Sequence, residues 1–436
     1  MITKKKRIMV DMSATLIHHG HIRLLKEASK LGNVIVGLTT DHEIKARKHY
    51  EPEMDFDSRK EVLESIKYVS EVVPTPWNID DAVMEKYLID HLVHGSDNVN
   101  DIDPEKLIIF PRTDGISSTD IRIRAQKAIT DQSNHKLMLT PGPAVLLHEN
   151  IQHLKPVFGR GDQEYLSIAE SVSDWIRSLS GQDELIMAQG SATFALELAA
   201  HSFVFGKVLI VSTGYYSDRL IKLLPKGCQV TMCNYEEMET ESGNFDWVMC
   251  AYTETSTAFK IDLERIKTKS NSLGAKLYVD ATGSIGLEEN HELADLMAFS
   301  SCKGLFGLTG ACFVAFKAGL KPKPLPSFYF NLKTQKNKMV TGPYHAITSL
   351  FGVMDKHEIL KERVSQSKNF VLEKWGKLAR KSNQPLLCTY LEGKVIPKDE
   401  NVILYSPRSN NTGSVICHFG EIHSDEIKLD TRIDFA

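Results

Sequence analysis

Short apolar runs alternate with amphipathic segments over residues 1–125, and this alternation constrains the fold more than any other feature. The apolar runs 8–10 and 34–38 predict buried strands, and the segment 20–31 between them has the apolar spacing of a helix. Further strand or helix candidates follow at 71–73, 83–92, 92–94 and 107–110. Such alternation predicts a parallel sheet with helices on both faces, in which ligands bind beyond the carboxyl ends of the strands.

Composition narrows the class of protein. The 436 residues are 42% hydrophobic and 25% charged, which is typical of a globular protein with two or three domains. The formal net charge of -4 gives no sign of a nucleic-acid partner. No apolar run reaches the ~18 residues that a membrane helix needs, and residues 1–7 do not resemble the start of a signal peptide. The seven cysteines lack paired CxxC spacing, so we expect neither a zinc site nor a disulfide framework, and a cytoplasmic location.

Two polar motifs lie where expected strands lead into expected helices. His18 and His21, in the string HHGH, open the first helix, so their imidazoles and the N–H groups of a positive helix terminus would face one point. The string RTDGISST at 112–119 places an arginine and hydroxyls before another helix. Such groups can hold a triphosphate and neutralise the charge that develops when its α-phosphate is attacked. Packing or surface roles fit the histidines taken alone, but not both motifs together.

This block, roughly residues 6–125, resembles the HxGH cytidylyltransferases, which activate glycerol phosphate, phosphocholine, phosphoethanolamine and alkylphosphonates with CTP. The resemblance implies a Rossmann-like nucleotidyltransferase fold in which His18 and His21 stabilise the transition state. The implied nucleotide-binding residues are His18, His21, Lys45 or Lys48, Asp97, Arg112, Ser117, Ser118 and Thr119. Arg59 also falls at a position of that site, and Mg2+ is expected with CTP.

One departure from the family pattern refines this resemblance. The family usually reads GxFDxxHxGH, whereas residues 13–17 here are SATLI and lack the acidic residue. Together with the strings GLTTD, VHGSD and GISST, this variant of the motif is most similar to the cytidylyltransferase domains of phosphonate biosynthesis.

The segment 124–136 is polar and has no apolar period, which predicts the end of a helix followed by a linker. We therefore divide the chain into domains at 1–130 and 131–436. No internal repeat is visible, so the second domain is not a copy of the first.

Polar side chains also follow the expected strands of the second domain. Small and hydroxyl residues at 191–193 open a helix after the strand 184–187, which suits either an anion cradle or a plain N-cap. Asp280 ends the apolar run 276–279, where an unpaired carboxylate is costly to bury. Lys303 lies between an apolar run and a glycine-rich loop, where desolvation can remove its proton and let it condense with an aldehyde. The interval 281–302 accommodates one helix and one strand.

Residues 138–436 resemble the class V, fold type I aminotransferases, matching LTPGP, GSATFALE, GYYSDR, ETST, VDATGSIG and SSCKG in that family's order. The resemblance implies pyridoxal 5'-phosphate as cofactor, with Lys303 as the Schiff-base lysine, Asp280 at the pyridine nitrogen and Tyr216 stacked on the ring. Further implied cofactor-binding residues are Ser191, Ala192 and Thr193 at the phosphate, Thr255 near the phenolic oxygen, and Thr341.

The resemblance also implies a homodimer, because the loop 340–344 that contains Thr341 matches one that reaches the cofactor of a neighbouring subunit. Arg432 is the counterpart of the arginine that binds the acid group of the substrate, and Arg160 is a second candidate. The alternative for both arginines is that they are ordinary surface residues without a binding role.

Together the two resemblances imply a bifunctional enzyme. An amino-acid donor would convert phosphonoacetaldehyde to 2-aminoethylphosphonate, and CTP would activate this product to CMP-2-aminoethylphosphonate. Three alternatives stay open. The acceptor could be phosphoethanolamine or serinol phosphate, the pyridoxal half could be a lyase or decarboxylase, or one half could be an idle scaffold for dimerisation.

Overall fold

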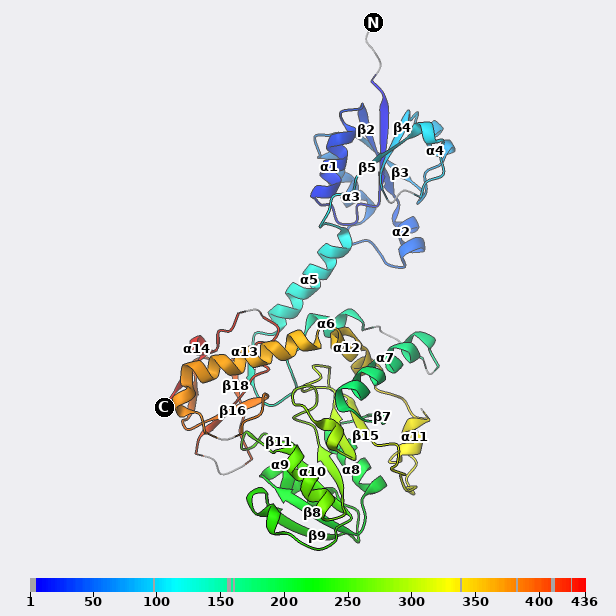
Figure 1. Ribbon diagram of the computed structural model, residues 1–436. Helices are drawn as coiled ribbons and strands as arrows, with labels where there is room; N and C mark the ends of the chain where they lie inside the picture. The colour runs from blue at the N-terminus through cyan, green and yellow to red at the C-terminus, as the bar shows by residue number, and fades with distance from the viewer. Residues whose placement is uncertain are drawn as a thin grey trace. The chain divides into compact units, whose positions relative to one another are not determined.

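A computed structural model describes residues 5–96, 99–154, 158–159, 161–337, 339–381, 383–408, 412–424 and 426–436. The chain forms two compact units, Met1–Ala128 and Ile129–Ala436. Figure 1 draws the first from blue to cyan and the second from cyan to red. Within the described ranges, no helix has both the length and the apolar character needed to cross a membrane.

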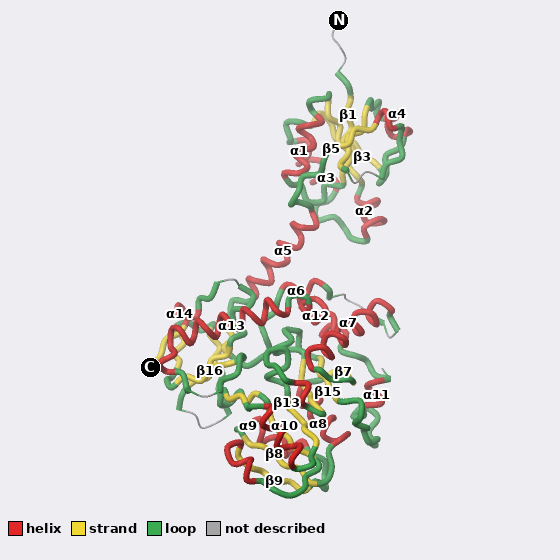
Figure 2. Tube along the Cα trace, in the orientation of Figure 1, coloured by secondary structure: helices red, strands yellow, loops and turns green. Residues whose placement is uncertain are grey.

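Unit 1 contains a five-stranded parallel sheet among its described residues, in the order β3-β2-β1-β4-β5. Figure 2 draws its strands in yellow. Its strands are β1 Arg7–Met12, β2 Asn33–Thr39, β3 Val69–Thr75, β4 His91–Gly95 and β5 Leu107–Phe110. Its helices are α1 His19–Ala28, α2 Asp41–Lys48, α3 Phe56–Glu64, α4 Asp81–Lys86, the 3-10 turn Pro104–Lys106 and α5 Ser118–Ser133. The parallel α/β block that the alternation predicts is thereby confirmed.

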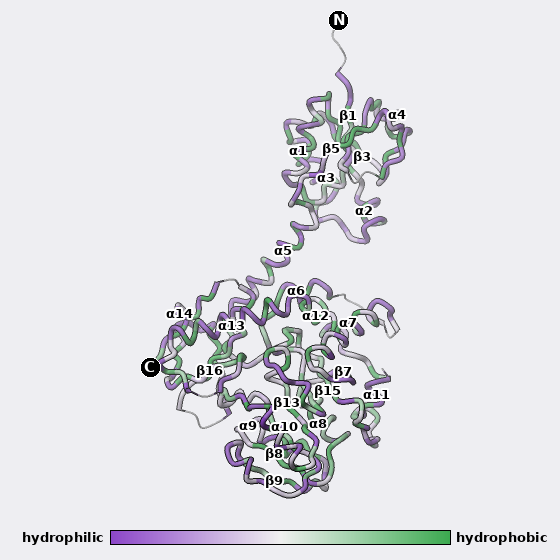
Figure 3. Tube along the Cα trace, viewed as in Figure 1, coloured by the Kyte–Doolittle hydropathy of each residue, from purple (hydrophilic) through white to green (hydrophobic). Residues whose placement is uncertain are grey.

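Both faces of this sheet are buried, because successive side chains of a strand point to opposite faces. In β1, Ile8 and Val10 pack with Leu25 of α1, whereas Met9 packs with Met84 of α4 on the other face. The helix α2 has a different pattern: it buries Ile44 and is otherwise mostly hydrophilic (Figure 3).

Unit 2 is built on a seven-stranded sheet among its described residues, in the order β7-β15-β14-β13-β10-β8-β9. The strands run parallel except β15, which is antiparallel to both of its neighbours. They are β7 Glu184–Gln189, β8 Lys207–Ser212, β9 Gln229–Asn234, β10 Trp247–Ala251, β13 Lys276–Asp280, β14 Leu296–Ser300 and β15 Ala311–Phe316.

Smaller strand pairs accompany this sheet. They are β6 Leu137–Leu139 with β18 Val402–Leu404, β11 Thr253–Glu254 with β12 Phe259–Lys260, β16 Cys388–Leu391 with β19 Ser414–Cys417, and β17 Val395–Pro397 with β20 Ile433–Phe435. The α-helices are α6 His148–Gln152, α7 Gln163–Ser180, α8 Ala192–Phe203, α9 Tyr215–Asp218, α10 Leu263–Ser272, α11 Leu332–Lys336, α12 Tyr344–Met354, α13 His357–Trp375 and α14 Leu429–Arg432. The 3-10 turns are Arg219–Leu223, Tyr235–Thr240, His291–Leu293 and Gly376–Leu378.

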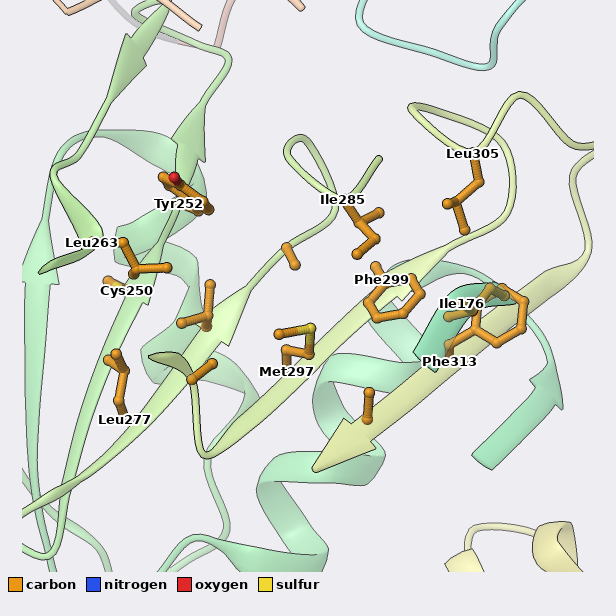
Figure 4. Close-up of a cluster of buried hydrophobic side chains, with 14 of the residues drawn as sticks. Ile176, Cys250, Tyr252, Leu263, Leu277, Ile285, Met297, Phe299, Leu305 and Phe313 are labelled. Carbon is orange, nitrogen blue, oxygen red and sulfur yellow. The ribbon is translucent and has the colours of Figure 1, made fainter. Parts of the chain in front are cut away.

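The seven-stranded sheet is also buried on both faces. Figure 4 shows one face, where Leu277, Met297 and Phe313 lie in a single cluster with Ile176 of α7. Tyr278 and its alternating neighbours face the opposite cluster, which α8 covers. Two-sided burial explains why the sequence of these strands is a continuous apolar run.

One local expectation differs from the structure. The interval 281–302 contains β14 but only the 3-10 turn His291–Leu293 in place of a helix. Gly286 and Asn290 adopt positive φ angles of 75° and 64°, which a right-handed helix does not accommodate. Within the segment 124–136, α5 ends at Ser133, and three residues then connect it to β6.

Arg59, on α3, ties together the loops that carry the strand ends of unit 1. Its side chain is fully buried, pairs with Asp41 and donates to the carbonyl oxygens of Ser13, Thr39 and Met54. The expectation from family resemblance placed Arg59 among nucleotide-site residues. The structure instead places it beneath the loop after β1, where it bonds backbone groups.

We expect Arg59→Met to destabilise unit 1 by about 3 kcal/mol, because it leaves buried carbonyls and a carboxylate without their cationic donor. Hydrogen exchange of peptides from residues 33–75 measures the effect. Lys60→Met, on the exposed side of the same helix, is the control and should leave exchange unchanged. Equal protection in the two variants would contradict this role.

Candidate active sites

The first candidate site is a cavity of about 710 Å³ in unit 1, beyond the carboxyl ends of β1, β4 and β5. Seven of the residues predicted for the nucleotide site line it: His18, His21, Lys48, Arg112, Ser117, Ser118 and Thr119. They come from the loops that follow the strands, as expected for a parallel sheet. The two motifs that lie far apart in the sequence therefore meet in one cavity.

The two histidines of the HHGH string form a close pair. Their ring centroids are 4.0 Å apart. Nδ1 of His18 accepts from the N–H of Gly20, and Nδ1 of His21 accepts from the N–H of His18, each at 3.2 Å. Accepting at Nδ1 leaves Nε2 of each neutral ring as the protonated donor atom. A Cβ at position 20 would lie 2.9 Å from the ring of His18, so glycine is required there.

Both imidazoles favour the neutral form. Burial, followed by the nearby His18, lowers the pKa of His21 to about 4. Burial is also the largest cause of the lowered pKa of His18, and His19 and Arg112 add to it. In the absence of a ligand the pair therefore provides neutral N–H donors, which hydrogen-bond an anion without a charge that must first be desolvated.

The N-terminus of α5 supplies a second set of donors. Ser117 caps this helix by accepting from the N–H of Asp120 at 3.0 Å. Ser118 donates to the carbonyl oxygen of Leu16 at 3.2 Å, which holds the helix against the loop that precedes His18. Helix N-termini with hydroxyl side chains bind phosphate oxygens well.

The two candidate lysines and Asp97 differ in their placement. Lys45 pairs with Glu51, is largely exposed and does not line the cavity. Lys48 does line it and lies 5.3 Å from the ring centre of Trp77, so Lys48 is the better placed of the two. Asp97 lies outside the described residues. Its role stays a prediction.

The sequence argument missed Arg122, which also lines the cavity. Its guanidinium bonds the hydroxyls of Thr15 and Tyr50 at 2.8 and 2.9 Å and the carboxylate of Glu53. The available signal was its place on α5, one helical turn after Ser118 and hence on the same helix face.

The second candidate site is a cavity of about 550 Å³ at the strand ends of unit 2. Its lining includes the predicted residues Lys303, Asp280, Tyr216, Thr255, Ser191, Ala192 and Thr193. Lys303 follows β14, Asp280 ends β13, and 191–193 open α8. The structure thus gathers the lysine, the carboxylate and the helix N-terminus that the sequence placed in order along the chain.

Asp280 is held from two sides although its side chain is only 4% exposed. Its carboxylate accepts from the N–H of Thr282 at 3.0 Å and lies 3.6 Å from the guanidinium of Arg219. Arg219 also lies 4.8 Å from the ring centre of Tyr216. The string GYYSDR was recognised as a motif, but the sequence gave no reason to assign this arginine to Asp280.

Lys303 lies against Tyr216 and Gly142. Its Nζ is 5.9 Å from the ring centre of Tyr216. A Cβ at Gly142, which has a φ of 139°, would lie 2.9 Å from Cγ of Lys303. Glycine at this position therefore allows the backbone of the LTPGP string to approach the lysine stem.

This cavity fits the predicted cofactor. The hydroxyls of Thr253 and Thr282 and Nε of Arg219 are buried without a hydrogen-bond partner among the described residues, and all three residues line the cavity. Such unsatisfied groups indicate a polar ligand. A phosphate suits the N-terminus of α8, a pyridinium N–H suits Asp280, and an aldehyde suits Lys303.

Glu254, in the ETST string, is a further residue that the sequence argument missed. It is fully buried and accepts the N–H groups of Tyr216 at 2.9 Å, Ser217 at 3.1 Å and Ser256 at 3.2 Å. Burial raises its pKa. Glu254 thus joins the loop that carries Tyr216 to the loop that carries Thr255.

Of the residues predicted for the substrate, Arg432 is described and does not line this cavity. Arg432 forms a bidentate ion pair with Asp399, at 3.0 and 2.8 Å, and bonds the carbonyl oxygen of His135 at 3.4 Å. Thr341 is exposed and likewise absent from the lining. Arg160 lies outside the described residues.

In the described part of the chain, no cluster of three His, Cys, Asp or Glu side chains is placed to hold a metal.

Comparison with known proteins identifies the first unit. The sequence model of the family described as cytidylyltransferase-like matches residues 15–124. Glycerol-3-phosphate cytidylyltransferase of Staphylococcus aureus is 38% identical over 125 residues, which are 27% of this chain and 92% of that protein. The chain belongs to the cytidylyltransferase-like family. The matched region contains His18, His21, Arg112 and the start of α5.

Beyond its cytidylyltransferase-like part, the chain has aminotransferase relatives. The 2-aminoethylphosphonate–pyruvate transaminase of Pseudomonas putida is 28% identical over 206 residues, which cover 42% of this chain and 55% of that relative. The solved aspartate aminotransferase of Thermus thermophilus superposes with a TM-score of 0.56 at 21% identity, covering 65% of this chain and 93% of that one. Unit 2 therefore has the fold type I architecture, and the predicted fusion of two enzyme families is confirmed.

We expect unit 1 to lose stability as pH falls from 6.5 to 4. The pKa of His21 is about 4 in the folded chain and ~6.5 in the unfolded chain. The unfolded chain therefore binds more protons in this window, and acidification favours unfolding by up to about 3 kcal/mol. Hydrogen exchange at pH 6.5 and 4.5 measures the loss, which His21→Gln should reduce. NMR of 13Cε1-labelled histidine checks the pKa, and titration of His21 near pH 6.5 would refute the expectation.

We expect Gly142→Ala to weaken binding of pyridoxal 5'-phosphate by about tenfold or more, because the added methyl group displaces the Lys303 stem and strains the backbone. Titration of the cofactor into apoprotein, followed by visible absorbance, measures its affinity. The control is Gly319→Ala, since a Cβ at Gly319 meets no atom within 4 Å. Unchanged affinity in Gly142→Ala would show that this contact is unimportant.

Proposed function

We propose that the chain is a bifunctional enzyme that makes 2-aminoethylphosphonate from phosphonoacetaldehyde and activates it with CTP to CMP-2-aminoethylphosphonate. The observation that carries the proposal is the presence in one chain of two cavities that gather the predicted site residues. One joins the histidine pair to the N-terminus of α5, and the other joins Lys303 to Asp280. The product of amino transfer is then the acceptor for cytidylyl transfer.

In the first cavity, an oxygen of the acceptor's phosphonyl group attacks the α-phosphorus of CTP. A new P–O bond forms, the bond from the α-phosphorus to the bridging oxygen breaks, and pyrophosphate leaves with that electron pair. Nε2–H groups of His18 and His21 donate to the oxygens on which charge develops. Arg112 and the N-terminus of α5 hold the departing phosphates. Mg2+ would enter with the triphosphate.

In the second cavity, bound pyridoxal 5'-phosphate supplies an aldehyde that exchanges amino groups and a ring that withdraws electrons. Lys303 would provide the amine that holds the aldehyde, and its Nζ would move protons. Asp280, held by Arg219, would keep a proton on the ring nitrogen, and Tyr216 would lie against the ring. The N-terminus of α8 would hold the phosphate, together with the hydroxyls of Ser191 and Thr193.

The choice of a phosphonate rests on the relatives of unit 2. The matched Pseudomonas enzyme acts on 2-aminoethylphosphonate and pyruvate by its name, and transamination is reversible. Amino transfer toward the amine would place this unit before a cytidylyltransferase that accepts the same compound. The amino donor would be an amino acid, and the subunits would pair as a homodimer in which Thr341 reaches the partner's cofactor.

A phosphate ester is the second candidate acceptor. It is favoured by the relatives of unit 1, which are named glycerol-3-phosphate cytidylyltransferases and are matched over nearly their whole length. Phosphoethanolamine or serinol phosphate would then replace the phosphonate. Both classes present a tetrahedral oxyanion to the same cavity, so the reaction at the α-phosphorus is unchanged.

The two activities should be separable by single substitutions. We expect His21→Ala to reduce pyrophosphate release from CTP by about 100-fold or more while amino transfer is retained, because the two sites use different residues. Lys303→Ala should abolish amino transfer and the visible absorbance of the bound cofactor while pyrophosphate release is retained. The assay uses the full chain with CTP, Mg2+ and pyridoxal 5'-phosphate.

A panel of acceptors decides the substrate class. It consists of 2-aminoethylphosphonate, phosphoethanolamine, serinol phosphate and glycerol 3-phosphate. Highest kcat/KM with 2-aminoethylphosphonate supports the proposal, whereas preference for an ester selects the second candidate. Loss of both activities in His21→Ala would contradict independent sites. Absence of cofactor absorbance in the wild-type chain would indicate an idle second unit.

A further inference from the structure

Arg122 is a cavity-lining cation of unit 1 that the roles above leave unused. It lies four residues after Ser118 on α5, about 6 Å along the helix axis. Its partners come from elsewhere: Thr15 from the loop after β1, and Tyr50 and Glu53 from the segment between α2 and α3. The guanidinium also lies 4.9 Å from the ring centre of Tyr50. A side chain fixed by three partners is positioned before any ligand binds.

The network leaves one edge of this guanidinium available. Nε bonds Glu53, and Nη2 bonds Thr15, Tyr50 and Glu53. No hydrogen bond of Nη1 to a described residue is found, so its two N–H groups can serve a ligand. The carboxylate of Glu53 offsets the charge of Arg122, but the Nη1 edge still offers two N–H donors to the oxygens of an anion. The bond from Arg122 is also the largest cause that lowers the pKa of Glu53, so the pair remains ionised at neutral pH.

The charges around the cavity favour more than one anionic ligand. Among its described lining residues, four side chains are lysine or arginine and two are carboxylates: Arg23, Lys48, Arg112 and Arg122 against Asp11 and Glu27. The histidine pair and Arg112 lie with the α5 N-terminus, where a triphosphate fits. Arg122 lies a turn further along α5, beside Thr15 and the segment after α2. Because Arg122 is one helical turn from the α5 N-terminus, we assign the two groups of donors to two different anions.

We propose that Arg122 binds the phosphonate or phosphate-ester group of the cytidylyl acceptor, and that it does not bind CTP. This inference rests on the proposed cytidylyltransferase activity and adds the residue that recognises the second substrate. Planar N–H pairs of arginine match the oxygens of such tetrahedral anions. Glu53, Tyr50 and Thr15 are positioning residues that hold the guanidinium in place.

The test compares Arg122→Gln with Arg124→Gln, a control on an exposed position of the same helix. We expect Arg122→Gln to raise the KM for 2-aminoethylphosphonate by about 30-fold or more. Its Kd for CTP, measured by calorimetry, should change less than twofold. Arg124→Gln should change neither quantity. An equal loss of CTP affinity would place Arg122 in the nucleotide site, and an unchanged acceptor KM would deny it any recognition role. Either result overturns the proposal.

Two further measurements guard against misfolding and against failure of the proposed activity. The double variant Arg122→Gln/Glu53→Gln leaves neither charge without its partner and should show the same rise in acceptor KM, while a wild-type KM in it would overturn the proposal. If the wild-type chain transfers CMP to no acceptor, the proposed function fails. Binding of methylphosphonate to the wild-type chain and to Arg122→Gln by calorimetry then still tests the anion site, and equal affinities would overturn it.

Discussion

Both cavities depend on one constraint of parallel sheets, namely that strands end at a common edge where the following helices begin. The N-terminal N–H groups of those helices point to that edge and carry partial positive charge. In unit 1 the helices are α1 and α5, which bring the histidine pair and Ser118 together. In unit 2 the helix is α8, next to the strand ends that carry Asp280 and Lys303. The sheet topology thus favours anion binding at this edge through backbone N–H groups alone, whatever the side chains are.

Buried charges then fix the loops that complete each site. Arg59 bonds the carbonyl oxygens of three separate segments of unit 1, and Glu254 collects backbone N–H groups from two loops of unit 2. Neither residue lines either of the two candidate cavities. Burying a charge is costly unless hydrogen bonds compensate it, so such residues specify one loop conformation more than they add net stability. The side chains that line the cavities need loops of one fixed conformation to hold them in place.

The chemical properties of the two cavities are complementary. The first combines neutral histidine donors with more cationic than anionic side chains, which suits a reaction between two anions at phosphorus. The second combines one lysine with a carboxylate and unsatisfied buried hydroxyls, which suits a planar cofactor with a phosphate. A compound carrying both an amine and a phosphonyl group could use both. The interpretation of the chain as consecutive reactions follows from this complementarity.

The sequence by itself determined the two fold classes and the residues at the strand ends. His18, His21 and Lys303 could be predicted because apolar periodicity places them where strands lead into helices or loops, and because the motifs around them resemble those of two known families. Only the tertiary structure decided what the other arginines do. Arg432 pairs with Asp399 away from the second cavity, and Arg122 meets Glu53 from 69 positions away. Local patterns do not encode such pairings, because they depend on how loops of irregular conformation approach one another.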